Sequence, residues 1–227
     1  MNLRLKTLAK MVDHNSRVAD IGTDHAYLPI ELVKNGRVKF AIASDIGQGP
    51  LLNAKKDIEE AGLQDSIETR LGNGLETITK KDEIDTVIVA GMGGKLMTEI
   101  LNSAWLKGFH FPTLILEPNV GESGVRSWLM IHGYKIIQEK ILAEAGHIYE
   151  LIKAVLTKKV KPLTEKELLF GPVIVQDKEP VFYEKWQNQL EYNQKLLLNL
   201  NRARKKDTER IKQLEYQIKL IKEELDD

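Results

Sequence analysis

An aspartate and a glycine near the N-terminus form the most chemically informative pattern in this sequence. Residues 18–29 read Val-Ala-Asp-Ile-Gly-Thr-Asp-His-Ala-Tyr-Leu-Pro, so Asp20 stands two positions before Gly22. An apolar strand that turns sharply at a glycine is typical of the first strand-to-helix turn of a doubly wound sheet, where nucleoside-bearing ligands bind. A carboxylate there suits a ligand with an amino group, because it accepts hydrogen bonds and attracts a cation. The pattern predicts a cationic cofactor such as S-adenosylmethionine.

The same stretch argues against a cofactor that carries a pyrophosphate. The dinucleotide pattern Gly-x-Gly-x-x-Gly requires later glycines, and Asp24 and Ala26 stand in their places. A nicotinamide dehydrogenase is therefore the least favoured enzyme class. His25, directly after Asp24, is expected to be either a base or a hydrogen-bonded structural residue. Tyr27 is expected to close over the cofactor or to stack on a target base.

Two further polar residues follow predicted strands at positions that suit an adenosine ligand. Asp45 ends the second strand, where a carboxylate accepts hydrogen bonds from ribose hydroxyls; the alternative is that it caps the next turn. Asn73, followed by Gly74, ends the third strand, where a side-chain amide reaches the exocyclic amine of adenine. The alternative there is an ordinary Asn-Gly turn. Ligands of doubly wound sheets bind at this edge, so both residues are expected in the cofactor site.

The residues after the fourth and fifth predicted strands are candidates for the reacting end of the site. The glycines of Gly91–Gly94 remove side chains beside the transferred group, and Met92 is expected to form an apolar wall. In Glu117-Pro-Asn119, the carboxylate is expected to orient a base or the cofactor amino group, and the amide offers a donor and an acceptor. Plain turn and loop roles remain the alternative. The candidate catalytic residues are Tyr27, Met92, Glu117, Pro118 and Asn119, and the candidate cofactor residues are Asp20, Gly22, Asp24, His25, Asp45, Asn73, Gly74, Gly91 and Gly93.

These residues require a parallel sheet that brings the strand ends together. Near-continuous apolar segments alternate with helix-like segments at βαβ spacing, which indicates an α/β fold with a sheet covered on both faces. The predicted strands are 18–21, 40–44, 67–71, 86–90, 113–116, 134–140 and 148–156, and the predicted helices are 3–12, 28–35, 50–61, 96–101 and 124–132. A short connection makes the last two strands antiparallel partners. The expected fold is a Rossmann-like class I methyltransferase sheet, mostly parallel, with seven strands.

The chain changes character after the last predicted strand. Lysines, prolines and a glycine mark residues 158–180 as a linker with a short helix at 164–169, whereas residues 181–227 contain neither glycine nor proline. Apolar positions there recur in steps of three and four, as in a coiled-coil seam. The seam residues are Tyr183, Trp186, Leu190, Leu197, Leu200, Ile211, Leu214, Ile218, Ile221 and Leu225, interrupted by Asn193 and by residues 201–210.

We expect this seam to form a C-terminal coiled-coil arm of two helices folded back on one another. The turn is placed near residues 206–208, where Asp207 or Thr208 caps the second helix. One long helix that dimerises is the alternative. The sequence thus predicts a cofactor-binding methyltransferase domain at 1–157, a linker at 158–180 and a helical arm at 181–227.

Composition limits the class of protein. The chain has 227 residues, 42% hydrophobic and 29% charged, with no net formal charge, so it is long enough to bury a core. It has no cysteine, which excludes disulfides and zinc–cysteine sites, and its five histidines lack metal-ligand spacing, so no metal is expected. No apolar run approaches the roughly 20 residues that span a bilayer, and no signal peptide is recognisable. We expect a cytoplasmic protein with no membrane partner.

Basic residues gather in two places despite the neutral total. Residues 195–212 hold seven lysines and arginines against two acidic residues, and the N-terminal segment is also basic. Such clusters favour binding to a phosphate backbone, although runs of charge often serve only to solvate a face. The candidate RNA-binding residues are Arg4, Lys6, Lys10, Arg202, Arg204, Lys205 and Lys206.

The sequence resembles the bacterial tRNA adenine-22 N1-methyltransferases over essentially its whole length. The motifs that carry the resemblance are Asp20–Pro29, Gly91–Gly94, Glu117–Asn119 and the helical arm. The resemblance implies a class I methyltransferase that binds S-adenosylmethionine, has tRNA as its partner and forms N1-methyladenosine. The family's cofactor-loop positions correspond to Asp20, Gly22, Asp24, His25, Asp45, Asn73 and Gly91.

The implied reaction needs little acid–base catalysis. Adenine N1 has a free lone pair, so the enzyme must mainly expose the base and hold it in line with the methyl group. Glu117 or Asn119 is predicted to stabilise the cationic product ring. Without the resemblance, two alternatives stand: a methyltransferase of a small molecule or another RNA, and a non-catalytic tRNA-binding protein. A monomer is expected, with weak dimerisation through the arm left open.

Overall fold

The computed structural model describes residues 2–203 and 206–226, and the chain forms two compact units. The sheet unit comprises Met1–Val173 and the helical unit comprises Ile174–Asp227. The boundary between the units falls inside the segment 158–180 that the sequence marks as a linker. In the described part of the chain, no helix combines the length and the apolar character that crossing a membrane requires.

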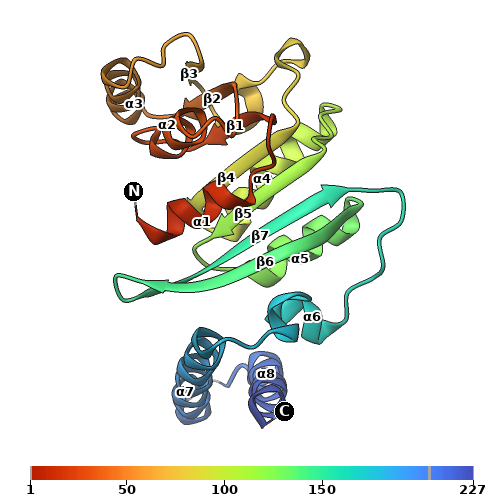
Figure 1. The fold of residues 1–227 in the computed structure, drawn as a ribbon. Coiled ribbons are helices and arrows are strands. Elements are labelled where there is room, and N and C mark those ends of the chain that lie inside the picture. Colours follow the sequence, from red (N-terminus) through yellow and green to blue (C-terminus); the bar gives the residue numbers. More distant parts are fainter. Residues whose placement is uncertain (1, 204–205, 227) are drawn as a thin grey trace. The chain divides into compact units, whose positions relative to one another are not determined.

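The sheet unit is built on seven strands (Figure 1). They are β1 (Arg17–Ile21), β2 (Phe40–Asp45), β3 (Ile67–Leu71), β4 (Thr86–Met92), β5 (Thr113–Pro118), β6 (Tyr134–Glu144) and β7 (His147–Leu156). Their order is β3-β2-β1-β4-β5-β7-β6. Strands β1 to β5 are parallel, and β7 is antiparallel to both β5 and β6. The predicted seven-stranded methyltransferase sheet with an antiparallel last pair is confirmed.

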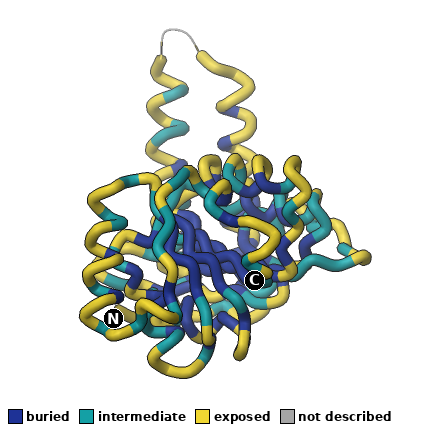
Figure 2. The backbone as a smooth tube through the Cα atoms, turned by 90° about the horizontal axis from the view of Figure 1, so that it is seen from above, coloured by how far each residue is buried: buried dark blue, intermediate teal, exposed yellow. Residues whose placement is uncertain are grey.

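Helices cover both faces of this sheet. They are α1 (Leu3–Met11), α2 (Tyr27–Lys34), α3 (Gln48–Glu60), α4 (Gly94–Leu106), α5 (Glu122–Ile131) and α6 (Glu165–Phe170), with the short 3-10 turns η1 (Gly74–Thr77) and η2 (Lys80–Asp82). Side chains alternate along each strand, so on β4 Val87 and Val89 join one apolar cluster and Ile88 joins the other. Helices α4 and α5 complete the first cluster, and α1, α2 and α3 complete the second. In Figure 2 the strands are accordingly buried, while the outer turns of the helices are exposed.

Several elements extend beyond their predicted bounds, and those bounds were wrong. The glycines after β4 suggested a loop, but β4 runs through Met92 because a register shift between Ala90 and Met92 lets it stay paired with β5. Helix α4 then begins at Gly94 rather than residue 96 and runs to Leu106. Strand β6 continues to Glu144, because a two-residue turn at 145–146 with positive φ at both positions joins it directly to β7.

A fully buried ionic cluster ties the end of the sheet unit to its core. Arg126 of α5 pairs with Glu139 of β6 at 2.8 Å and with Glu150 of β7 at 2.5 Å. Its Nη1 also donates to carbonyl groups at the end of α6, and the Val173 amide donates to Glu139. Gly171 passes so close that a Cβ there would lie 2.7 Å from both Arg126 and Glu139. Residues up to Val173 therefore belong to the sheet unit.

Aromatic side chains pack the C-terminal ends of α4 and α5 against the sheet. The Trp105 and Trp128 ring centroids lie 6.3 Å apart, edge to face. Trp128 also stacks on His132 at 4.0 Å and on Tyr134 at 5.9 Å. The two tryptophans of the sheet unit thus share one aromatic cluster, which joins α4, α5 and the start of β6.

The helical unit contains the 3-10 turn η3 (Ile174–Gln176) and two helices that pack on one another, α7 (Pro180–Arg202) and α8 (Thr208–Asp226). The two-helix prediction is confirmed, and Asp207 caps α8 by accepting from the Arg210 amide at 3.1 Å. One detail of the predicted seam was wrong, because Tyr183 is 41% exposed and the adjacent Phe182 is buried instead. Asn193, the polar residue that interrupts the apolar seam, is buried within it and accepts a hydrogen bond from Gln189.

Candidate cofactor and target-base site

Two adjoining pockets lie at the carboxyl ends of the central strands. The β1–β4 pocket, of about 300 Å³, and the β2–β3 pocket, of about 160 Å³, are both lined by Gly22. The strand order reverses between β1 and β4, which is where doubly wound sheets bind ligands. The β1–β4 pocket is lined by Arg4, Leu5, Asp20, Gly22, Thr23, Asp24, His25, Tyr27, Leu28, Ala90 and Gly91, and the β2–β3 pocket by Ile21, Gly22, Ser44, Asp45, Ile46, Gly72, Asn73, Gly74, Met92, Leu96 and Ile100.

Gly22 forms the turn that separates the two pockets. Its φ of +82° lies in the left-handed region, and a Cβ on it would collide with the Met92 side chain. The amides of Gly22 and Thr23 both donate to the Ser44 carbonyl, at 2.8 and 3.1 Å, which ties the turn to β2. Only glycine fits this backbone without displacing the Met92 side chain, which lines the β2–β3 pocket.

Asp20 is a buried carboxylate in the wall of the β1–β4 pocket. It is 6% exposed and accepts a hydrogen bond of 2.6 Å from the Thr23 hydroxyl. Burial raises the pKa of Asp20 to about 6, the Thr23 hydrogen bond opposes this rise, and the charge of Asp45 adds to it. A carboxylate in this state gains from a bound cation, because the cation offsets the cost of burying the charge. Thr23 was not among the predicted site residues, although it stands inside the first motif.

Asp45 and Asn73 line the β2–β3 pocket, as the sequence predicts for an adenosine site. Asp45 Oδ1 accepts a hydrogen bond of 2.7 Å from the Gly47 amide, so this residue caps the turn and also lines the pocket. Gly74 has a φ of +55°, and a Cβ on it would lie 2.8 Å from Ile100 Cγ2. The loop after β3 therefore packs closely on α4.

His25 and Tyr27 stand at the mouth of the β1–β4 pocket. His25 Nδ1 lies 2.8 Å from Asp57 Oδ2 on α3, and its ring stacks on Tyr27 with centroids 5.0 Å apart. The Tyr27 side chain is half exposed. Asp57 orients His25, which in turn supports an aromatic surface beside the pocket. The partnership with Asp57 was not predicted, because a single acidic residue on a helix gives no signal in the sequence.

Glu117 is fully buried at the end of β5. Arg4 Nη1 lies 2.5 Å from Glu117 Oε2, and the Arg4 guanidinium also lies over the Tyr149 ring at 5.2 Å. Burial raises the pKa of Glu117, and the charge and hydrogen bond of Arg4 oppose this rise. The Gly91 backbone hydrogen bond opposes the rise in the pKa of Glu117 as well. Glu117 lines neither pocket, but it pairs with Arg4, which lines the β1–β4 pocket.

The basic residues of the predicted RNA-binding set fall in different surroundings. Arg4 lines the β1–β4 pocket and pairs with Glu117, so it belongs to this site rather than to an open basic surface. Lys6 and Lys10 of α1 are exposed on the sheet unit. In the helical unit Arg202 and Lys206 are exposed, and the candidates Arg204 and Lys205 lie outside the described residues.

Asn119 braces the glycine segment at the reacting end. Its Nδ2 donates to the Gly91 carbonyl at 2.9 Å, and its amide donates to the Met92 carbonyl at 2.8 Å. Pro118 is buried in β5 opposite Met92, and Gly93 is the N-cap of α4; neither lines either pocket. Within the described residues, no group of three or more His, Asp or Glu side chains is arranged to hold a metal ion.

Comparisons with known proteins identify the family. The family model described as tRNA (adenine(22)-N(1))-methyltransferase matches residues 18–223. The tRNA (adenine(22)-N(1))-methyltransferase of Bacillus subtilis (strain 168) is 36% identical over 232 residues, covering 100% of this chain and 97% of the relative.

Two solved structures extend this similarity to the whole fold. Streptococcus pneumoniae Sp1610, in complex with S-adenosyl-L-methionine, is 37% identical with a TM-score of 0.90, and 99% of each chain is covered. M. capricolum TrmK, in complex with S-adenosyl-homocysteine, is 34% identical with a TM-score of 0.87, covering 100% of this chain and 98% of the other. The family model matches most of the chain, and the Bacillus subtilis relative is 36% identical over the full length of this chain. The protein therefore belongs to the tRNA (adenine(22)-N(1))-methyltransferase family.

Proposed function

We propose that this protein transfers a methyl group from S-adenosylmethionine to N1 of adenine 22 in tRNA, with the cofactor held across the β1–β4 and β2–β3 pockets. The observation that carries this assignment is the pair of pockets that meet at Gly22, with Asp20 in one and Asp45 in the other. The cofactor and cofactor product in the two solved relatives support it.

The side chains present fit the parts of this cofactor. Asp20, buried and with a raised pKa, binds the amino group, because a cation relieves its desolvation. Asp45 binds the ribose hydroxyls, and Asn73 binds the exocyclic amine of adenine. When bound, S-adenosylmethionine supplies an electrophilic methyl group. Gly91, which lines the β1–β4 pocket without a side chain, leaves room beside that group.

The target adenine is proposed to enter the β1–β4 pocket beside Tyr27, whose half-exposed ring is available for stacking. Glu117 does not line this pocket but pairs with Arg4, which does. Arg4 favours the ionised form of Glu117, so the carboxylate can stabilise the positive charge that the ring acquires on methylation. Since N1 carries a free lone pair, these residues orient the base and do not need to remove a proton from N1.

Exposed basic residues are proposed to hold the rest of the tRNA. Lys6 and Lys10 of the sheet unit, and Arg202 and Lys206 of the helical unit, are free to contact phosphates. Helices α7 and α8 bury their apolar seam against one another, so the helical unit does not need a second copy to cover it. We therefore propose that the protein acts as a monomer.

The test is methyl transfer to two unmodified tRNA transcripts that differ only in having adenine or guanine at position 22. Labelled S-adenosylmethionine and nucleoside analysis of the product should show N1-methyladenosine in the first transcript only. An Asp45→Ala variant should bind the cofactor more weakly and lose transfer. Cofactor binding without transfer to either transcript would reject the tRNA substrate and favour a small-molecule methyltransferase.

A further inference from the structure

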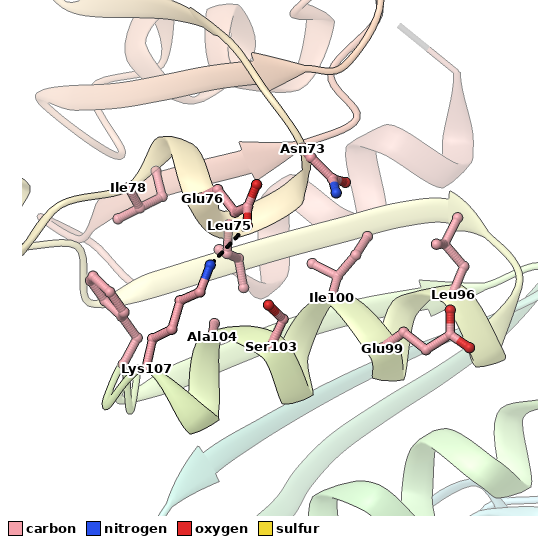
Figure 3. A pocket seen from close by; sticks show the side chains of 11 residues that line it. Asn73, Leu75, Glu76, Ile78, Leu96, Glu99, Ile100, Ser103, Ala104 and Lys107 are labelled. Atoms are coloured by element: carbon pink, nitrogen blue, oxygen red, sulfur yellow. Dashed lines mark hydrogen bonds and ion pairs between the residues drawn. The ribbon is translucent and has the colours of Figure 1, made fainter.

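We propose that the cofactor cleft opens at its adenine end into a separate pocket that binds an apolar group carried on N6 of an adenosine ligand. This α4–η1 pocket, of about 310 Å³, lies between α4 and η1 (Figure 3). It shares Asn73, Leu96 and Ile100 with the β2–β3 pocket, so the two pockets adjoin one another. The inference rests on the proposed function, because it places the adenine ring in the β2–β3 pocket beside Asn73.

Apolar side chains form one part of the wall of the α4–η1 pocket. Leu75 and Ile78 contribute to it from the η1 side, and Ala104 contributes from α4; all three are buried. Ile100 and Phe109 are partly buried and also line it. A planar hydrocarbon group gains from leaving water for such a surface, so the lining favours an aryl or alkyl substituent.

Charged groups stand at the edge of the pocket and select against an anionic ligand. At the end away from Asn73, Lys107 Nζ lies 2.8 Å from Glu76 Oε1 and connects α4 to η1 (Figure 3). This pair neutralises the lysine, and Glu99 of α4 also lines the pocket and pairs with Lys95 at 4.0 Å. A phosphate-bearing chain would therefore find no unpaired cation in the lining, whereas an uncharged substituent needs none.

The junction at Asn73 explains why the substituent belongs on N6. The proposed role of Asn73 is to accept a hydrogen bond from the exocyclic amine, and the same residue lines the entrance to the α4–η1 pocket. A monosubstituted N6 keeps one N–H for Asn73 and directs its other bond past it. From Leu96 to Leu106 helix α4 rises about 15 Å, so the wall that it forms is long enough for a ring and a short link.

Calorimetry with S-adenosylhomocysteine and its N6-benzyl derivative tests this pocket. Wild-type protein should bind both compounds within about tenfold of each other. Ser103 lines the pocket from an exposed position on α4, so Ser103→Trp should fill it and weaken the N6-benzyl compound by about tenfold or more, with S-adenosylhomocysteine affinity retained. The neighbouring Asn102 is exposed and does not line the pocket, so Asn102→Trp should alter neither affinity.

Three results separate the possible failures. The pocket proposal is overturned if wild-type protein binds S-adenosylhomocysteine but excludes the N6-benzyl compound, or if the ratio of the two dissociation constants is the same in wild type and Ser103→Trp. Wild-type protein that binds neither compound would overturn the proposed function as well. If Ser103→Trp alone loses both ligands through misfolding, Ser103→Leu, which adds less volume to the same wall, decides the question.

Discussion

Asp20 shows how a single side chain is prepared for a charged ligand. Its carboxyl group is buried, Thr23 holds one oxygen, and Asp45 lies near enough to add to the rise in pKa. In the free protein above pH 6 this position holds a buried negative charge. A bound ammonium group would pair with that charge. Because the carboxylate is already desolvated in the free enzyme, less of the attraction to the ammonium group is lost to desolvation when the complex forms.

This arrangement predicts a pH-dependent cofactor affinity. The affinity of wild-type protein for S-adenosylmethionine should rise as pH increases through about 6, because the ionised form of Asp20 is the one that binds the amino group. Asp20→Asn should bind more weakly and lose this step. Titrations between pH 5 and 8 measure it, and parallel pH profiles for the two proteins would rule out this role.

The Asp20 carboxyl group also makes the stability of the ligand-free protein depend on pH, in the direction opposite to the cofactor affinity. Since burial raises the pKa of Asp20 from 3.8 to about 6, the folded protein binds this proton more tightly than the unfolded chain, and the free energy of unfolding falls as pH rises between those values. Asp20→Asn removes the penalty and should stabilise the ligand-free protein at pH 8 by up to about 3 kcal/mol. Urea unfolding should show this gain at pH 8 and little difference at pH 4.

Glu117 predicts an effect on rate rather than on cofactor binding. Glu117→Gln keeps the shape of the side chain but removes the charge proposed to stabilise the methylated ring, so single-turnover methylation should slow by roughly 10- to 100-fold. The dissociation constant of S-adenosylmethionine should stay unchanged. Asn119→Ala, which loses the hydrogen bond to Gly91, should cause a smaller loss. Unchanged rates in both variants would exclude a role for this pair in catalysis.

At the scale of elements, the turn between β1 and α2 requires glycine at position 22 for two reasons, its positive φ and its close contact with another side chain. Gly22 and Gly36 both have positive φ, +82° and +64°, but only Gly22 lies against another side chain, that of Met92. Alanine at either position should cost about 1 kcal/mol of stability from backbone strain. Gly22→Ala should in addition push Met92 into the β2–β3 pocket and weaken cofactor binding, whereas Gly36→Ala should not. Equal cofactor affinities in the two variants would refute this steric account.

The elements that sequence could predict are those whose signal is local. A buried parallel strand is a short run of apolar residues, so all seven strands were predicted near their true positions. The helix ends before Gly36, Gly62 and Gly133 were also predicted to within one or two residues. The start of α4 was not, because Gly94 begins this helix only through its close packing on the loop before α5, where its amide donates to the Val120 carbonyl. Phe182 and Tyr183 fit the sequence pattern of an apolar seam equally well. Only the packing of the helices shows that Phe182 is the buried one.

The site residues, too, could be predicted from the sequence only where their signal is local. Asp20, Asp45 and Asn73 were predicted because each stands near the carboxyl end of a recognisable strand, and the sheet brings their positions to adjoining pockets. The Arg4–Glu117 pair joins residues 113 positions apart, and the sequence marks Arg4 only as one of several basic residues. The contact depends on α1 packing against the sheet, which no local pattern specifies.

At the scale of the whole molecule, the division into two units predicts the outcome of truncation. A fragment of residues 1–173 keeps the Val173 amide on Glu139 and the α6 carbonyls on Arg126. It should bind S-adenosylmethionine like the full chain but lose tRNA methylation, since it lacks the basic residues of the helical unit. A fragment of residues 1–157 loses these partners and should unfold at a lower temperature.

Calorimetric melting and cofactor binding of the two fragments check this expectation. Equal melting temperatures would show that the segment 158–173 contributes nothing to the sheet unit. Full tRNA methylation by the fragment 1–173 would reject the proposed role of the helical unit in holding the substrate.

The positions of the three tryptophans give the protein a natural optical label for each unit. Trp105 and Trp128 share the aromatic cluster of the sheet unit, and Trp186 is the one tryptophan of the helical unit. Emission from a Trp186→Phe protein therefore reports the sheet unit alone, and the difference from wild type reports α7. Each unit's melting can thus be followed in the intact chain without an attached dye, and non-coincident transitions would show that the two halves unfold separately.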